Sequence, residues 1–177
     1  MDRRAFTFGL LALATPAAAK TKPIAYQGAE IVAFASPEKT GTVIVNTEHR
    51  ALYHIISPGS AIRYGVAVGK EGFDWAGIAK VGRKVAWPRW TPPDAMIKRK
   101  PELEQWRYGM PGGPKNPLGA RALYLFDAKG DTGFRIHGTN EPSSIGSAAS
   151  SGCIRMLNEE VSELYEQVKI GTKVIVL

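Results

Sequence analysis

The stretch FRIHGTNEPSSIGSAASSGCIRM, residues 134–156, contains the only cysteine of the chain and one of its three histidines. A short alternating run from Phe134 closes at His137 before a glycine, so we expect a strand that ends at the histidine. Cys153 follows a turn of small residues, and a loop rich in glycine, serine and alanine joins it to the strand. Only the fold can bring the two side chains together across that loop.

These residue types favour nucleophilic catalysis by a thiol. A thiol reacts as its thiolate, and a histidine with a pKa near neutrality is the usual proton acceptor, here His137 for Cys153. The backbone N–H groups of Gly152 and Cys153 lie in the turn and are candidates for stabilising an oxyanion. We expect Arg155 to provide positive charge for a substrate or for the thiolate. Ser151 is expected to support hydrogen bonding around the histidine.

Composition favours one globular domain, and the spacing of possible ligand residues indicates no metal site. The chain has 177 residues, of which 44% are hydrophobic and 22% charged, with a formal net charge of +7. Its basic residues form no stripe interleaved with aromatics, which argues against a nucleic-acid partner. The other histidines, His49 and His54, are expected in a turn and a strand, and no metal-ligand spacing appears. The proposed chemistry requires no cofactor.

The first 19 residues are typical of an export signal. A charged start is followed by an apolar run at residues 6–14, too short to span a membrane, and by three alanines at residues 17–19. The pair Arg3 and Arg4 fits a twin-arginine signal or the basic end of a plain secretory signal, and both interpretations stay open. We therefore expect the mature protein in the periplasm or cell envelope.

Hydrophobic patterning predicts a mostly β fold. An N-terminal arm at residues 20–40 is expected to carry one short strand. Further strands are expected at residues 41–46, 51–56, 62–68, 78–85, 122–126 and 173–177, the first three forming an antiparallel sheet. Asn158 is expected to cap a helix whose apolar stripe runs from Val161 to Val168 and which ends at Gly171.

Residues 69–113 form an insert that contains all four tryptophans and several prolines. Prolines remove backbone donors, so we expect an irregular segment with two helical turns, at residues 94–98 behind an Asp94 cap and at residues 101–106. The insert is interpreted either as a wall or lid over the thiol, or as a segment whose tryptophans pack it onto the side of the sheet. Both interpretations stay open.

The residues also resemble a known family. The pattern His137-Gly138-Thr139, a serine- and glycine-rich loop, then Ser151-Gly152-Cys153-Ile154-Arg155-Met156 resembles the catalytic signature of the L,D-transpeptidases of the YkuD or ErfK/YbiS type. Residues 110–125 resemble the segment before the catalytic loop, and the likeness covers residues 41–177. Many members have a second histidine before the Gly-Cys pair, where this chain has Ser151. The resemblance implies a β-sandwich or barrel-like domain with a short C-terminal helix.

The resemblance also implies a function. It indicates acyl transfer on peptidoglycan stem peptides through a thioester on Cys153, with cleavage at an L-to-D peptide bond. The acceptor would be the amine of a second stem, an envelope lipoprotein or water, and the residues leave this choice open. A different class remains: a non-catalytic wall-binding module that uses the aromatic insert and the positive charge. A thiol no more reactive than free cysteine would favour that alternative.

Overall fold

The computed structural model describes residues 26, 28–70 and 75–177, so the expected export signal lies outside the described residues. The strands are β1 (Glu30–Ala33), β2 (Val43–Asn46), β3 (Ala51–Ser57), β4 (Ser60–Gly65), β5 (Val68–Gly69), β6 (Gly77–Ala86), β7 (Arg121–Asp127), β8 (Gly130–His137), β9 (Ala148–Ser150), β10 (Ile154–Arg155) and β11 (Lys173–Val176). The helices are α1 (Asp94–Arg99) and α2 (Asn158–Gln167), with 3-10 helices η1 (Pro101–Trp106) and η2 (Pro142–Ser144). The predicted mostly β fold is confirmed.

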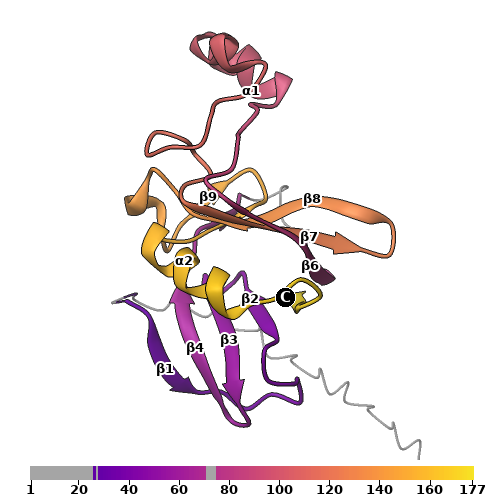
Figure 1. The fold of residues 1–177 in the computed structure, drawn as a ribbon. Helices are drawn as coiled ribbons and strands as arrows, with labels where there is room; N and C mark the ends of the chain where they lie inside the picture. Colours follow the sequence, from indigo (N-terminus) through magenta and orange to yellow (C-terminus); the bar gives the residue numbers. More distant parts are fainter. Residues whose placement is uncertain (1–25, 27, 71–74) are drawn as a thin grey trace, which may run out of the picture.

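One mixed sheet organises the molecule, in the order β1-β4-β3-β2-β11-β6-β7-β8-β10. The closing strand β11 lies at its centre, parallel to β2 and antiparallel to β6. It therefore joins an N-terminal half, β1 to β4, to a second half built from β6, β7 and β8, and Figure 1 shows the two halves with α2 beside their junction. A separate pair, β5 and β9, lies parallel.

A single large core connects both halves of the sheet and α2. It contains Val43, Val45, Leu52 and Tyr64 from the first half, Val81, Leu123, Leu125 and Ile136 from the second, and Val161 and Leu164 from α2. The helical stripe is thus confirmed as core packing. Each fully buried side chain of this size contributes about 1.5–3 kcal/mol of transfer free energy, so this core fixes the position of β8 and everything after it.

The strand expected at residues 62–68 is interrupted, which corrects the sequence prediction. β4 ends at Gly65, where an added Cβ would lie 2.4 Å from the ring of Tyr26. Ala67 then pairs with Arg155, through hydrogen bonds of 2.9 Å in both directions, before β5 begins. The chain stops pairing with β3 after Gly65, because Ala67 instead pairs with Arg155 at the outer edge of β10.

The helix boundaries also differ from the prediction. Asp94 is the first residue of α1 and Asn158 the first residue of α2, and neither side chain caps its helix. α2 ends at Gln167 rather than near Gly171. Gly171 lies in the next turn, with φ +92°, and donates its N–H to the Val81 carbonyl of β6. A glycine adopts this backbone conformation without steric cost, so Gly171 forms the turn that precedes β11 rather than the end of α2.

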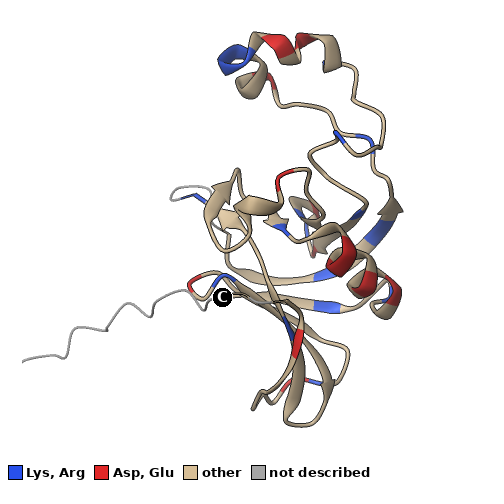
Figure 2. Cartoon of the chain, turned by 90° about the vertical axis from the view of Figure 1, so that its left-hand side faces the viewer, with Lys and Arg blue, Asp and Glu red and all other residues tan. Residues whose placement is uncertain are grey.

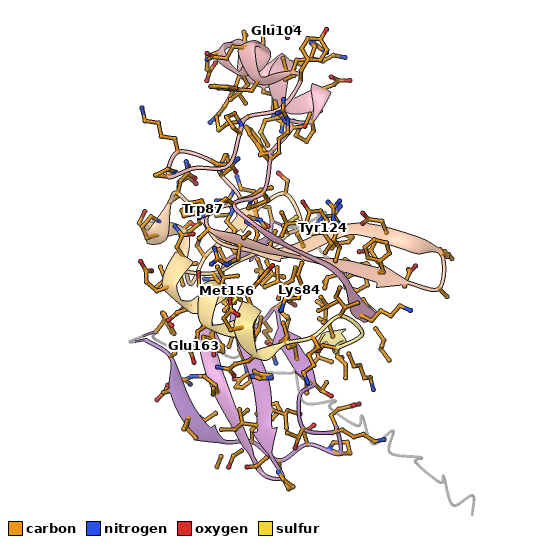
Figure 3. The ribbon with its side chains drawn as sticks, viewed as in Figure 1. Lys84, Trp87, Glu104, Tyr124, Met156 and Glu163 are labelled. Atoms are coloured by element: carbon orange, nitrogen blue, oxygen red, sulfur yellow. The ribbon has the colours of Figure 1, made fainter. Side chains whose placement is uncertain are left out.

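The insert divides into two parts. Trp75 stacks on Phe134 with ring centroids 5.1 Å apart and packs against the core, as one interpretation predicted. α1 and η1 instead project away from the sheet (Figure 1), and Trp87, 48% exposed, lies near the base of this projection (Figure 3). The buried amide of Asn116 ties the base together by donating to the carbonyls of Pro88, Met110 and Pro111.

Charge is distributed unevenly over these elements. Figure 2 shows acidic residues gathered along α2, whereas the tip formed by α1 and η1 carries both signs. Across residues 26, 28–70 and 75–177, none of the helices has both the length and the apolar character that crossing a membrane requires.

Candidate active site

Strand pairing brings the cysteine to the histidine. β10 runs parallel to β8, with Ile154 opposite Ile136 and Arg155 opposite His137. Side chains of paired residues point to the same face and alternate along each strand. Ile136 and Ile154 face the core, so His137 and Arg155 lie on the other face, and Cys153, two residues before Arg155, is placed on that face too. The predicted pair thus lies on neighbouring backbone segments of one sheet face.

The histidine is held in one tautomer. His137 is 4% exposed, and its Nδ1 lies 2.6 Å from the carbonyl oxygen of Gly138. A carbonyl only accepts, so Nδ1 carries the proton and Nε2 keeps its lone pair. Burial lowers the pKa of His137 to about 4, and the positive charges of Arg155 and Arg135 act in the same direction. At neutral pH the ring is therefore a neutral proton acceptor.

The thiol is protonated at rest. Burial raises the pKa of Cys153, against the opposing effects of the Arg135 backbone N–H and of the positive charges on Arg135 and Arg155. Cys153 is nevertheless partly exposed, so a substrate can reach it. A neutral thiol and a neutral imidazole need no compensating charge in the resting protein.

Ser150, which the sequence prediction did not include, holds the turn that contains Cys153. Its hydroxyl donates to the Cys153 carbonyl at 2.5 Å and accepts the Gly152 N–H at 3.1 Å. The Gly152 N–H is thus engaged in the resting protein and must leave Ser150 to reach an oxyanion, whereas Cys153 offers its own N–H in the same turn. Ser151 is exposed, and the role predicted for it around His137 stays a prediction.

Two arginines surround the pair. Arg155 makes an ion pair of 3.0 Å with Glu141 from the loop that joins the two strands. Arg135 lies on the same face as His137 and makes an ion pair of 2.7 Å with Asp131. Both guanidinium groups lower the pKa of the Cys153 thiol, which is the electrostatic effect that the sequence assigned to Arg155 alone.

Asn158 holds the backbone next to the histidine. Its Oδ1 accepts the N–H groups of Ala120 and Thr139, at 3.0 and 3.2 Å, and its Nδ2 donates to the Thr139 carbonyl at 2.9 Å. An added Cβ on Gly138 would lie 2.2 Å from Oδ1, so a glycine is required for this close approach. Asn158 therefore positions the segment whose Gly138 carbonyl orients His137.

Nothing in the described part of the chain gathers three or more His, Cys, Asp or Glu side chains in a metal-binding cluster. Two surface hollows lie away from Cys153. One is lined by α1 and η1, and the other by residues 37–42 with the end of α2 and the turn after it. The candidate site along β8 and β10 therefore lies outside both hollows.

Residues 40–176 match the family described as YkuD, the L,D-transpeptidase catalytic domain. The chain belongs to that family. Among curated relatives, the Escherichia coli protein named probable L,D-transpeptidase YbiS is 36% identical over 139 residues, covering 76% of this chain and 43% of that protein. The chain thus spans less than half the length of this relative. The family resemblance inferred from residues 134–156 is confirmed.

Solved structures support the same fold. An Enterococcus faecium L,D-transpeptidase is 18% identical, with a TM-score of 0.58 over 78% of this chain and 50% of that one. A Brucella melitensis protein described as a probable carnitine operon oxidoreductase is 47% identical, with a TM-score of 0.58 over 84% of this chain and 92% of that one. The oxidoreductase description belongs to that protein, and the family of this chain follows from the match over residues 40–176.

Proposed function

We propose that this member of the L,D-transpeptidase family catalyses acyl transfer on peptidoglycan stem peptides in the cell envelope, with Cys153 as nucleophile. The observation that carries the proposal is the pairing of β10 with β8, because it puts a partly exposed thiol on the same sheet face as a histidine whose Nε2 can accept a proton. Membership of the family supports the choice of substrate class.

In the first half-reaction, the sulfur of Cys153 attacks the carbonyl carbon of the L-to-D peptide bond. The thiol proton passes to Nε2 of His137, and the negative charge on the carbonyl oxygen is stabilised by backbone N–H groups of the turn. Because the resting thiol and imidazole are both neutral, we expect proton transfer to accompany the attack. Collapse of the tetrahedral intermediate breaks the C–N bond, the leaving amine takes the proton from His137, and a thioester remains.

In the second half-reaction, an amine attacks the thioester, gives a proton to His137 and releases the Cys153 thiol, which regains that proton. An amine of a second stem would give a cross-link, and an amine of an envelope lipoprotein would give an attached protein. Water would give a shortened stem. The residues along β8 and β10 perform the same proton transfers in each case, so the acceptor has to be identified from the product.

The test is incubation of the purified protein with tetrapeptide muropeptides, followed by mass spectrometry of the products. Wild type is expected to give cross-linked or shortened stems, and Cys153→Ala and His137→Ala should give neither. If wild type leaves the stems unchanged but retains wall polymer, the binding-module alternative replaces the enzyme. Alkylation of the thiol does not discriminate between these two functions, because burial raises the pKa of Cys153 and makes the resting thiol slow.

A further inference from the structure

The sheet face that carries the thiol also carries a row of cationic and aromatic side chains. Arg83 on β6 is opposite Tyr124 on β7, and Tyr124 is opposite Arg135 on β8. The guanidinium carbons of Arg83 and Arg135 lie 3.9 and 4.3 Å from the centre of the Tyr124 ring. Parallel pairing of β10 extends this row to Cys153, which is next to Arg135. We call Arg83, Tyr124 and Arg135 the arginine row.

This row lies on the face opposite the core. Tyr124 projects from the side of β7 turned away from α2 (Figure 3). Lys84 lies on the opposite side, where its ammonium group donates to the carbonyls of Tyr165 in α2 and of Val168 just after it. Tyr124 is 8% exposed because the two arginines cover its ring, and Arg83 itself is exposed. The tyrosine thus supports two guanidinium groups at a surface that begins beside the nucleophile.

The charges on this face are not balanced. Arg135 is paired with Asp131 through both terminal nitrogens, and Arg155 is paired with Glu141. Arg83 adds a third positive charge, so these five groups carry a net charge of +1 within reach of the thiol. A planar guanidinium binds a carboxylate through two hydrogen bonds, and stacking on an aromatic ring fixes its plane in advance.

We propose that the arginine row is a carboxylate subsite that holds a carboxylate group of the stem peptide while its neighbouring carbonyl reacts at Cys153. Neighbouring strands are about 4.8 Å apart, so Arg135 is about one strand and Arg83 about three strands, roughly 14 Å, from the backbone at Cys153. A peptide advances about 3.5 Å per residue, so a carboxylate one to four residues from the reacting carbonyl reaches the row. This proposal rests on the proposed function, and it adds that the substrate carries a negatively charged carboxylate near the reacting carbonyl.

Two groups of a stem have this chemistry: a carboxylate at the end of a side chain, and the free carboxylate of the terminal residue. Three synthetic tetrapeptides distinguish them. The parent peptide carries both carboxylates, a second has the side-chain carboxylate as a primary amide, and a third has the C-terminal carboxylate as a primary amide. Each is assayed with wild type, Arg83→Gln, Arg135→Gln, the charge-conserving Arg83→Lys, and a control, Lys80→Gln, which removes an exposed positive charge from the same strand.

Loss of a charge-assisted bidentate contact is expected to reduce kcat/KM of Arg83→Gln on the parent peptide by about tenfold. Arg135 already bonds Asp131 through both terminal nitrogens, so it contributes positive charge to the subsite rather than a bidentate contact. Arg83→Lys should recover part of that loss, and Lys80→Gln should behave as wild type. On the peptide whose amide replaces the bound carboxylate, wild type and Arg83→Gln should become equally slow. Arg135→Gln should be slower than wild type on all three peptides, because it also removes a positive charge that lowers the pKa of Cys153. An equal penalty for Arg83→Gln on all three peptides, or no penalty on any, overturns the subsite. Inactivity of wild type on all three peptides would instead refute the acyl-transfer function.

Discussion

Replacing Asn158 with alanine tests how the fold positions His137, the proposed proton acceptor. The amide makes three hydrogen bonds of 2.9 to 3.2 Å to the backbone of Ala120 and Thr139, and alanine leaves those groups without partners. At about 1 kcal/mol for each bond, the variant should lose about 3 kcal/mol of unfolding free energy. For a domain of this size that corresponds to a decrease of about 6–12 °C in Tm.

The same change should affect the reaction. Gly138 follows His137 directly, and its carbonyl orients the imidazole, so movement of this segment misplaces Nε2. Misplacement of a reacting group by about 1 Å costs on the order of a hundredfold in rate, so we expect kcat to fall strongly with little change in KM. Asn158→Asp keeps the acceptor for both N–H groups and should retain more stability than alanine.

The assay is urea-induced unfolding monitored by tryptophan fluorescence, together with steady-state kinetics on a tetrapeptide donor. Asn140→Ala is a matched control, because this exposed side chain in the neighbouring loop donates one hydrogen bond, to the Lys115 carbonyl at 3.1 Å. The control should lose less than 1 kcal/mol. If Asn158→Ala also lost less than 1 kcal/mol and kept the wild-type kcat, the positioning role would be refuted.

Three further predictions follow from burial. Burial raises the pKa of Glu160 from 4.5 to about 7, so the folded chain binds this proton more tightly than the unfolded chain does. The free energy of unfolding therefore falls as the pH rises from 4.5 to 7. Glu160→Gln should add about 3 kcal/mol to that free energy at pH 8 and nothing at pH 4.5, as measured by urea unfolding at both pH values. With the pKa of His137 near 4, kcat/KM should stay constant down to about pH 5, and a decline centred near pH 6.5 would contradict a neutral buried base. Met156→Ala removes a fully buried side chain and should cost about 2–5 kcal/mol in the same unfolding assay.

Local patterns predicted much of the site. The alternating run that closes at His137 defined β8, and the same alternation put Arg135 and His137 on one face, a signal available in the sequence that was not used. The resemblance over the Gly-Cys-Ile-Arg segment correctly indicated the family. The strand and the family motif each depend only on residues that are neighbours in the chain, so the sequence alone was enough to predict them.

Features that depend on distant pairing could not be predicted. Asn158 at the start of a helix suggested a cap, but its amide instead contacts backbone 19 and 38 residues away. Ser150 and Ser151 are neighbouring serines, and only the fold buries Ser150 and directs its hydroxyl to the Cys153 carbonyl. The interruption after Gly65 reflects the pairing of Ala67 with Arg155, and no local composition marks it. In each case a long-range backbone contact overrides the local preference.

The most direct test of acyl transfer through Cys153 is the intact mass of the protein, quenched in acid within seconds of mixing with a tetrapeptide donor. The account predicts an adduct at Cys153 whose added mass equals that of the donor minus the free terminal amino acid, which leaves as an amine. It should be absent in Cys153→Ala, and it should disappear when an amine acceptor is added. Turnover of the donor by Cys153→Ala at the wild-type rate would contradict the account, because another group would then be the nucleophile.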